Sequence, residues 1–564
     1  MTVSKSLQLQ FRLHSRRYVS TKAHYITTPI FYVNAKPHLG HFYSMTLADV
    51  YNRWNKFKGR ETFFTTGTDE HGLKVQNAAS AADNTDPKLF CDKLSDKFKE
   101  LAEIGDIKYD RFIRTTDPDH LESVNAFWKT VWDKGYIYKG QHSGWYSISD
   151  EAFYTENDIE EIVNDKGDKK MVSKETGSEV TFEKEENYFF KLSTFQDKLI
   201  EFLEENPDFI QPKKYYNVVL NELKTETLPD LSVSRPSWRL QWGITVPNDD
   251  SQKIYVWFDA LINYITSIGY PNSATPGLPS PTHLIGKDIT RFHCIHWPSF
   301  LMAAGLPLPK NVFVHGHWLM SGRKMSKSRG NVADPIEIAE YYGVDALRLF
   351  IMRFSVLEND GNYSEDGLNS TRTEFIDKFC NLLVRSLSKN FSITRALSRV
   401  ENMSLEELID SQDDLEFKKD LYELFTSIDS LEKEIDPLFQ TFTMHKAIQC
   451  IWSLLPKINF LFDKYQPWTL KSKENVDEEI NKKNLLKQDL IIFAALDSLR
   501  CCLILLQPVI PNYAKLLLDR LNVDTHKRGV EFSKIGTDLS YGMDTVFKKG
   551  EKVPLQRLEL KSDL

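Results

Sequence analysis

The chain has 564 residues, of which 41% are hydrophobic and 27% are charged, and its formal net charge is −8. A chain of this length is too long to fold around a single hydrophobic core, so we predict about three or four domains. Its composition is that of an ordinary globular protein. No stretch of the sequence approaches the ~20 apolar residues that a membrane-spanning helix needs. The acidic balance argues against a protein that coats nucleic acid nonspecifically, although a local basic face would still suffice for a nucleic-acid partner.

The first 23 residues differ in composition from the rest of the chain. They contain five lysines and arginines, several serines and threonines and no acid, and the first acidic residue is Asp49. This composition is typical of a mitochondrial transit peptide, with a disordered basic tail as the alternative. We therefore predict import into the mitochondrial matrix.

Residues 24 to about 140 alternate apolar runs with an amphipathic segment. Residues 25–33 and 61–66 are typical of buried strands, and the apolar spacing between them predicts a helix over about 41–57. Because strand, helix and strand follow one another, this segment predicts a parallel sheet. Such a sheet binds its ligand at the carboxyl ends of the strands.

The pattern changes between about 141 and 230. Short strand-like pieces, such as residues 144–148, surround a charged run from 156 to 186, which predicts an insertion with solvated loops. The α/β pattern then resumes, and three apolar runs are predicted to be buried strands: 254–258, 282–286 and 311–315.

After about residue 370 strand signals nearly vanish. Long periodic segments over 375–388, 415–435, 444–464 and 485–506 predict a helical bundle, whereas the last ~40 residues are polar and irregular and predict no role. The predicted fold class is therefore α/β, with a Rossmann-like parallel sheet interrupted by an insertion and followed by an all-α bundle. The six cysteines form no Cys-x-x-Cys, so neither a disulfide framework nor a cysteine zinc site is indicated, and a reducing compartment fits.

The first chemical motif is His38-Leu39-Gly40-His41, placed where the first predicted strand gives way to a helix. Gly40 allows a ligand to approach the backbone closely, and a helix N-terminus favours a phosphate. Both imidazoles can donate to phosphate oxygens near neutral pH. Two histidines at this position can alternatively do no more than cap the helix.

The second motif is Lys324-Met325-Ser326-Lys327-Ser328, which lies between Gly322 and Gly330. Flexible lysines between glycines suit a loop that closes on a triphosphate and stabilises the charge passing to pyrophosphate. The alternative is a solvated basic loop. Together the two motifs can hold ATP while its α-phosphorus is attacked, which indicates an enzyme that activates a carboxylate as an adenylate.

The two motifs, in this order, resemble the signatures of class I aminoacyl-tRNA synthetases, and further segments resemble the methionyl-tRNA synthetase family. These segments are residues 28–34 (TPIFYVN), 66–72 (TGTDEHG), 256–260 (VWFDA) and 285–288 (IGKD), and the resemblance covers roughly residues 24–470. It implies a methionine–tRNA ligase that forms methionyl-adenylate and pyrophosphate from methionine and ATP. The enzyme would then esterify methionine onto the 3′-terminal ribose of its tRNA.

The resemblance also implies the roles of individual residues. The methionine pocket would be lined by Ile30, Tyr32, Trp257, Ala260, Leu261, Tyr264, Ile289 and His293, with Asp69 pairing the substrate ammonium. The catalytic residues would be His38, His41, Lys324 and Lys327. Further ATP contacts would come from Gly40, Asp259, Lys287, Asp288, Met325, Ser326 and Ser328. Mg²⁺ is expected with the ATP, and no protein ligand for it can be named.

In the helical region the resemblance implies that Asn381, Arg385 and Trp468 read the anticodon. An amide and a guanidinium can read the edges of splayed bases, and an indole offers a stacking face. Outside this context the Asn381–Arg385 pair, four residues apart on a helix, would be an ordinary surface pair. Many relatives carry zinc-binding cysteines in the insertion, but none lies between Cys91 and Cys294 here, so we predict no structural zinc. The insertion would have its own small core that includes Trp145, Tyr146 and Phe153.

The predicted domains follow from these roles. They are a transit peptide (1–23), two halves of the catalytic domain (24–140 and 236–315), a connective insertion without zinc (141–235), a signature-loop and stem-contact region (316–370), a helical anticodon-binding domain (371–525) and a C-terminal tail (526–564).

Three alternatives remain open at this point. One is a sibling synthetase for leucine, valine, isoleucine or cysteine, although the insertion of ~90 residues is short for an editing domain. The others are a small-molecule nucleotidyltransferase, which would lack the second motif and the long helical region, and a noncatalytic tRNA-binding relative, which should have lost signature residues. The predicted partners are tRNA(Met), methionine and ATP, with no membrane, and the predicted oligomeric state is a monomer.

Overall fold

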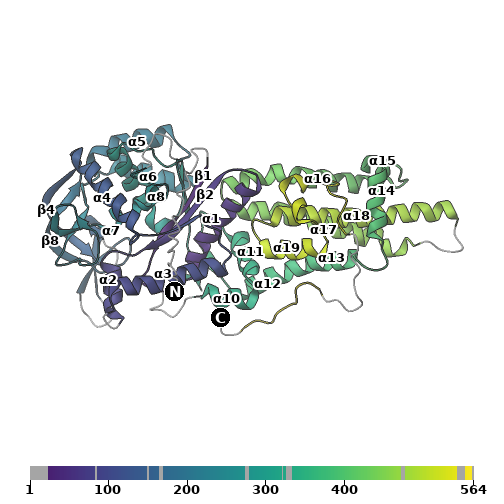
Figure 1. Cartoon of the computed structure of the whole chain (residues 1–564), viewed down its shortest axis with the longest axis horizontal. Coiled ribbons are helices and arrows are strands. Elements are labelled where there is room, and N and C mark those ends of the chain that lie inside the picture. Colours follow the sequence, from purple (N-terminus) through teal and green to yellow (C-terminus); the bar gives the residue numbers. More distant parts are fainter. Residues whose placement is uncertain are drawn as a thin grey trace, which may run out of the picture.

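The computed structural model describes residues 23–82, 85–148, 152–163, 169–272, 279–320, 322–324, 333–471, 477–542 and 553–561. The predicted transit peptide therefore lies outside the described residues except for Ala23, and so does most of the second motif, from 325 onwards. Figure 1 shows an α/β half and a helical half placed side by side, with α1 (Leu39–Phe57) where the two halves meet. No helix among the described residues has the length and apolarity needed to cross a membrane.

A parallel sheet forms the centre of the α/β half. Its order is β3 (Arg111–Arg114), β2 (Thr62–Asp69), β1 (His24–Tyr32), β14 (Thr282–Gly286), β15 (Asn311–His315) and β9 (Ile210–Gln211). The predicted strands at 25–33, 61–66, 282–286 and 311–315 and the helix at 41–57 are confirmed. The chain runs outward in both directions from β1 and β14, so the topological switch point, where α/β sheets bind ligands, lies between these two strands.

Helices cover the sheet and connect its strands. They are α2 (Leu73–Ala81), α3 (Pro87–Ile104), α4 (Pro118–Asp133), α5 (Gln196–Glu205), α6 (Lys213–Thr225) and α9 (Trp297–Ala304). A buried cluster on the side of α4 and α9 joins Phe127, Phe258 and Trp297. A larger cluster around α1 continues without a break into the helical half.

The insertion is built on an antiparallel sheet of β10 (Leu231–Ser232), β8 (Thr181–Phe190), β4 (Ile137–Ser147) and β5 (Ala152–Tyr154), and β6 (Ile159–Val163) pairs with β7 (Lys169–Ser173). Of its predicted core, Tyr146 is buried and the ring of Trp145 lies 5.5 Å from that of Phe182. The side chain of Phe153 is outside the described residues. Strand β9 lies within the predicted insertion but pairs with β15, so part of this region belongs to the parallel sheet.

The predicted strand at 254–258 is wrong beyond its first residue. Strand β13 (Asp249–Ile254) pairs with β11 (Ser234–Pro236) and β12 (Thr245–Val246), and the chain then turns into α7 (Val256–Leu261) and α8 (Asn263–Thr266). A short apolar run is equally compatible with a buried helix, and here α7 buries all of its residues except Trp257, which is partly exposed.

The helical half contains α13 (Asn381–Ser386), α14 (Ile393–Asn402), α15 (Leu405–Asp410), α16 (Leu415–Gln440), α17 (Met444–Tyr465), α18 (Glu478–Leu506) and α19 (Pro511–Arg520). The predicted helices at 415–435, 444–464 and 485–506 are confirmed. The one at 375–388 is interrupted, because α12 (Glu365–Phe375) reaches α13 through a π-helical turn at Ile376–Cys380.

Between the halves lie α10 (Pro335–Tyr342), α11 (Val344–Phe354) and a small sheet of β17 (Arg323–Lys324), β16 (Trp318–Met320) and β18 (Gly361–Tyr363). The end of the chain, residues 553–561, runs back along α10 and α12. Arg372 on α12 donates to the carbonyl of Gln556 at 2.5 Å, and the hydroxyl of Tyr341 on α10 donates to that of Glu559 at 3.1 Å. The C-terminal segment, for which the sequence predicts no role, therefore clamps these two helices together.

Candidate active site

A pocket of about 830 Å³ opens at the carboxyl ends of β1, β2, β14 and β15. Its walls bring together most of the residues that the sequence predicts for methionine and ATP: Ile30, Tyr32, His38, Gly40, His41, Asp69, Trp257, Ala260, Leu261, Tyr264, Asp288, Ile289 and His293. These residues come from segments more than 250 positions apart, so only the fold makes them neighbours.

The histidine motif begins α1 and gives both imidazoles the same tautomer. His38 Nδ1 accepts from the backbone N–H of Gly40 at 3.0 Å, and His41 Nδ1 accepts from the backbone N–H of His38 at 3.0 Å. Each neutral ring therefore carries its proton on Nε2, where it can donate to a phosphate oxygen. A Cβ at position 40 would lie only 2.9 Å from His38 Cε1, so glycine is needed for the ring to fold over the helix end. Capping and phosphate donation use different nitrogens and are compatible.

One face of the α7–α8 segment forms the apolar wall of the pocket. Trp257, Ala260, Leu261 and Tyr264 follow the i, i+3, i+4, i+7 spacing of a single helical face, and all four line the pocket. The ring of Trp257 stacks on that of Phe292, with centroids 3.7 Å apart and planes 6° apart. A flat aromatic wall of this kind suits a thioether, whose polarizable sulfur packs well against rings.

Tyr264 and His293 form a buried hydrogen bond at the base of the pocket. His293 Nδ1 lies 3.0 Å from the carbonyl of Ile289, to which it donates, so its Nε2 accepts from the Tyr264 hydroxyl at 2.7 Å. Burial lowers the pKa of His293 to about 4 and raises that of Tyr264. Both groups are therefore neutral at physiological pH, and the base of the pocket is polar without being charged.

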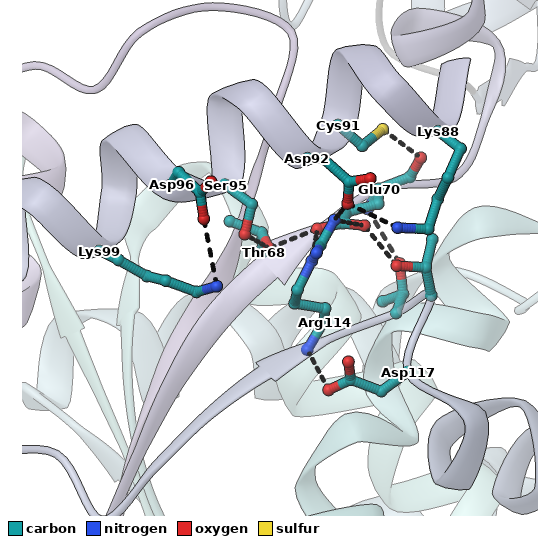
Figure 2. A network of polar contacts seen from close by, with 12 residues as sticks. Thr68, Glu70, Lys88, Cys91, Asp92, Ser95, Asp96, Lys99, Arg114 and Asp117 are labelled. Atoms are coloured by element: carbon teal, nitrogen blue, oxygen red, sulfur yellow. Dashed lines mark hydrogen bonds and ion pairs between the residues drawn. The ribbon is translucent and has the colours of Figure 1, made fainter. Parts of the chain in front are cut away.

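Asp69 ends β2. The next residue, Glu70, is held in place by hydrogen bonds to several neighbouring side chains (Figure 2). Arg114 holds the Glu70 carboxylate with two hydrogen bonds of 2.6 and 2.9 Å, and Thr68 and Thr116 donate to it at 2.8 and 2.6 Å. Successive side chains in an extended chain point to opposite sides, so anchoring Glu70 outside the pocket directs Asp69 into it.

His71, the residue after Glu70, is held by Asp259, which the sequence predicts to contact ATP. In the structure it is 1% exposed and does not line the pocket. Its two oxygens each lie 2.7 Å from an imidazole, that of His71 and that of His120. Burial acts to raise the pKa of Asp259, but the two imidazoles outweigh it and the pKa lies below its ordinary value. Asp259 therefore positions α7 behind the pocket wall and is not placed to touch a nucleotide in this conformation.

Lys287 and Asp288 follow β14 and differ in their surroundings. Lys287 Nζ pairs with the carboxylate of Asp360 at 2.8 and 2.9 Å and does not line the pocket, whereas Asp288 lines it and lies 3.1 Å from His317 Nε2. Lys324 lies in β17, whose partner strand β16 begins with the pocket residue Trp318. Met325, Ser326, Lys327 and Ser328 are outside the described residues.

The sequence did not predict His315, which ends β15, or His317, two residues later, and both line the pocket. His315 Nε2 lies 2.9 Å from the hydroxyl of Ser44 on α1, and burial lowers the pKa of His315 to about 4. The sequence pattern His-Gly-His at the end of the predicted strand 311–315 could have indicated them as binding residues. No group of three side chains arranged to hold a metal ion occurs among the described residues.

The three predicted anticodon residues lie far from this pocket, in the helical half. Arg385 on α13 pairs with Asp463 near the end of α17 at 2.8 Å, and its guanidinium lies 5.4 Å from the ring of Phe462. Trp468 follows α17 in a short turn, Pro467–Thr469, and is 42% exposed. Asn381 donates to Asp377 at 3.1 Å. The Arg385–Asp463 pair therefore links α13 to the segment that presents Trp468.

A family model described as "tRNA synthetases class I (M)" matches residues 24–387, and with this fold and pocket it makes the chain a class I aminoacyl-tRNA synthetase. The chain is 48% identical to the mitochondrial methionine–tRNA ligase of Candida albicans over 96% of this chain and 97% of that one, and 40% identical to the human mitochondrial enzyme over 90% and 85%. It belongs to the methionyl-tRNA synthetase family.

A solved structure of the Mycobacterium tuberculosis methionyl-tRNA synthetase in complex with methionyl-adenylate matches with a TM-score of 0.82 and 35% identity. The match covers 95% of this chain and all of that one. The predicted arrangement of a Rossmann-like catalytic sheet followed by a helical domain is therefore confirmed.

Proposed function

We propose that the pocket between β1 and β14 binds methionine and ATP side by side and joins them as methionyl-adenylate. The observation that carries this proposal is the convergence of the α1 histidines, Asp69 and the α7–α8 aromatic face on one cavity. The chain is a methionine–tRNA ligase of mitochondria, like its relatives from Candida albicans, Saccharomyces cerevisiae and human. It activates methionine with ATP and charges tRNA.

The methionine subsite consists of the apolar wall and the polar base. Trp257, Ala260, Leu261 and Tyr264 would surround the thioether together with Ile30, Tyr32, Ile289 and His293, and Asp69 would pair with the ammonium group. Because Tyr264 and His293 are neutral, they can bond a polar atom without attracting an ion. This combination favours an uncharged side chain over lysine or glutamate.

The ATP subsite uses the start of α1. The Nε2 protons of His38 and His41 and the backbone at Gly40 would hold the triphosphate, with Lys324 and Lys327 closing over it and Asp288 contacting the nucleoside. Lys287, Met325, Ser326 and Ser328 are proposed as further contacts.

A carboxylate oxygen of methionine bonds to the α-phosphorus, the bond from the α-phosphorus to the bridging oxygen of the β-phosphate breaks, and its electrons leave with pyrophosphate. No side chain acts as a nucleophile, so positioning and cationic stabilisation supply the catalysis. ATP is proposed to bind as its Mg²⁺ complex.

The second step requires tRNA, which we propose to span both halves of the molecule. Its terminal ribose hydroxyl attacks the methionyl carbonyl and releases AMP, while its anticodon contacts Asn381, Arg385 and Trp468 some distance away. The domain limits given above, a monomeric state, an insertion without zinc and a transit peptide at residues 1–23 complete the proposal.

Two variants separate the two steps. Asp69→Asn removes the charge that pairs with the ammonium group and should raise the KM for methionine about 10- to 100-fold in ATP–pyrophosphate exchange, leaving the KM for ATP nearly unchanged. Trp468→Ala should spare this exchange and raise the KM for tRNA in charging. If Asp69→Asn raised both KM values equally, or Trp468→Ala lost both activities, the assigned roles would be wrong.

A further inference from the structure

Trp238 is a tryptophan whose side chain lies largely on the surface of the protein and not in its core. It lies in the loop between β11 and β12 and is 72% exposed, more than any other phenylalanine or tryptophan among the described residues. The next residue, Arg239, has its guanidinium carbon 5.6 Å from the indole and 5.0 Å from the ring of Tyr146. An exposed indole beside a cation offers a stacking surface and a positive charge together.

The loop that carries Trp238 is held by hydrogen bonds to α2 and within itself. Gln76 on α2 accepts from the backbone N–H groups of Gln241 and Trp242 at 2.8 and 3.0 Å. Arg239 and Leu240 both donate their backbone N–H groups to the carbonyl of Pro236 at 3.0 Å. A loop held in this way loses little conformational entropy when a ligand binds to it.

The same loop is fixed directly to the pocket. The Trp242 indole donates to the carbonyl of Glu70 at 2.5 Å, and the backbone N–H of Gly72 donates to the carbonyl of Trp242 at 3.1 Å. These contacts lie immediately after Asp69. Helix α2 begins here, and its first turn contributes Lys74 to the pocket wall, to which the segment after β1 contributes Lys36. The loop that carries Trp238 is therefore connected to the pocket through Trp242, and two lysines line that pocket.

We propose that Trp238 and Arg239 hold the unpaired 3′ end of tRNA at the entrance to the pocket. This inference rests on the proposed function, in which the terminal ribose of the tRNA must enter this cavity. One of the last bases stacks on the indole, and the adjoining phosphate lies near the guanidinium. Stacking of unpaired bases on aromatic side chains, with arginine assisting, is the usual chemistry of single-strand recognition, and lysines 36 and 74 complement the strand's charge.

The test combines variants of Trp238 with two forms of the tRNA, one complete and one lacking its unpaired 3′ nucleotides. Trp238→Ala should weaken binding of complete tRNA about tenfold but leave binding of the truncated tRNA unchanged. Trp238→Tyr, which keeps an aromatic face, should restore most of the loss. Trp132→Ala is the matched control, because this indole is also exposed (44%) but lies on α4. ATP–pyrophosphate exchange should be unaffected in all three variants.

Other outcomes would overturn the inference. If Trp238→Ala weakened both forms of the tRNA equally, or neither, the indole would not contact the 3′ end. Unchanged tRNA binding together with a loss of self-association in sedimentation would show that Trp238 contacts a second copy of the chain. Absence of exchange in the unmodified protein would instead contradict the proposed function itself, so the two failures are distinguishable.

Discussion

Tyr264 and His293 show at the residue scale how burial determines the chemistry of the pocket. Most pocket residues were predictable only through the resemblance to the methionyl-tRNA synthetase family, which the segments around His38 and Trp257 carry. The role of Asp259 was not predictable, since the sequence cannot tell which carboxylate near the motifs faces the cavity. In the structure its partners, His71 and His120, come from separate segments and turn it away from the pocket.

Buried neutral histidines make the stability of the molecule depend on pH. Burial lowers the pKa of His293 and His315 to about 4 and that of His296 to about 3. In the unfolded chain these groups titrate near 6.5. Below that pH the unfolded chain binds protons that the folded one excludes, so we expect the free energy of unfolding to fall steadily from pH 7 to pH 5.

Urea denaturation at pH 7, 6 and 5 measures this dependence. His296→Gln should reduce the slope of stability against pH, whereas His526→Gln, at an exposed position, should leave it unchanged. A slope that is the same in the His296 variant as in the unmodified protein would mean that this histidine is not kept neutral by burial.

At the element scale, the strands and long helices were predictable from periodicity, but the turns that aim side chains into the pocket were not. The apolar run at 254–258 contains too few residues to distinguish strand from helix, and only packing on the parallel sheet decides for α7. The anchoring of Glu70 by Arg114 was equally invisible, because β2 and β3 are neighbours only in the folded sheet.

This anchor leads to a prediction for the end of β2. Glu70 is fully buried and Arg114 is 16% exposed, so Arg114→Ala leaves a buried carboxylate that keeps two hydroxyl donors but loses its cation. We expect a loss of about 3–5 kcal/mol in unfolding free energy. The KM for methionine should also rise, because Asp69 is the adjacent residue. Lys97→Ala, which breaks an exposed pair with Glu100, is the control and should leave the free energy of unfolding unchanged within the error of the measurement. Similar losses in both variants would show that Glu70 is not anchored as described.

At the scale of the whole molecule, one buried arginine joins the two halves. Arg348 on α11 has no exposed surface and donates to Asp49 of α1 at 2.7 Å, to the carbonyl of Gly105 at 3.1 Å and to that of Val509 at 2.9 Å. The helical half also packs on α1 through Trp54, which stacks on Phe439. The existence of two parts was predictable from composition and periodicity. Their junction was not, because it depends on backbone carbonyls that any sequence supplies.

Arg348→Ala tests this junction. Removing the guanidinium leaves Asp49 buried with one cation fewer, and we expect a destabilisation of about 3–5 kcal/mol, seen as a lower urea midpoint in both halves. Lys515→Ala, which removes an exposed pair with Asp519, should leave the midpoint within the error of the measurement. A loss confined to the helical half would contradict a role of Arg348 in joining the halves.

The central claim is that one pocket activates methionine with ATP, and amino-acid-dependent ATP–pyrophosphate exchange tests it most directly. Exchange should be measured with methionine, leucine, isoleucine, valine and cysteine in separate reactions. Methionine alone should support exchange, because the aromatic wall and neutral base of the pocket fit its thioether. Exchange with another of these amino acids in place of methionine, or with none of them, would contradict the claim.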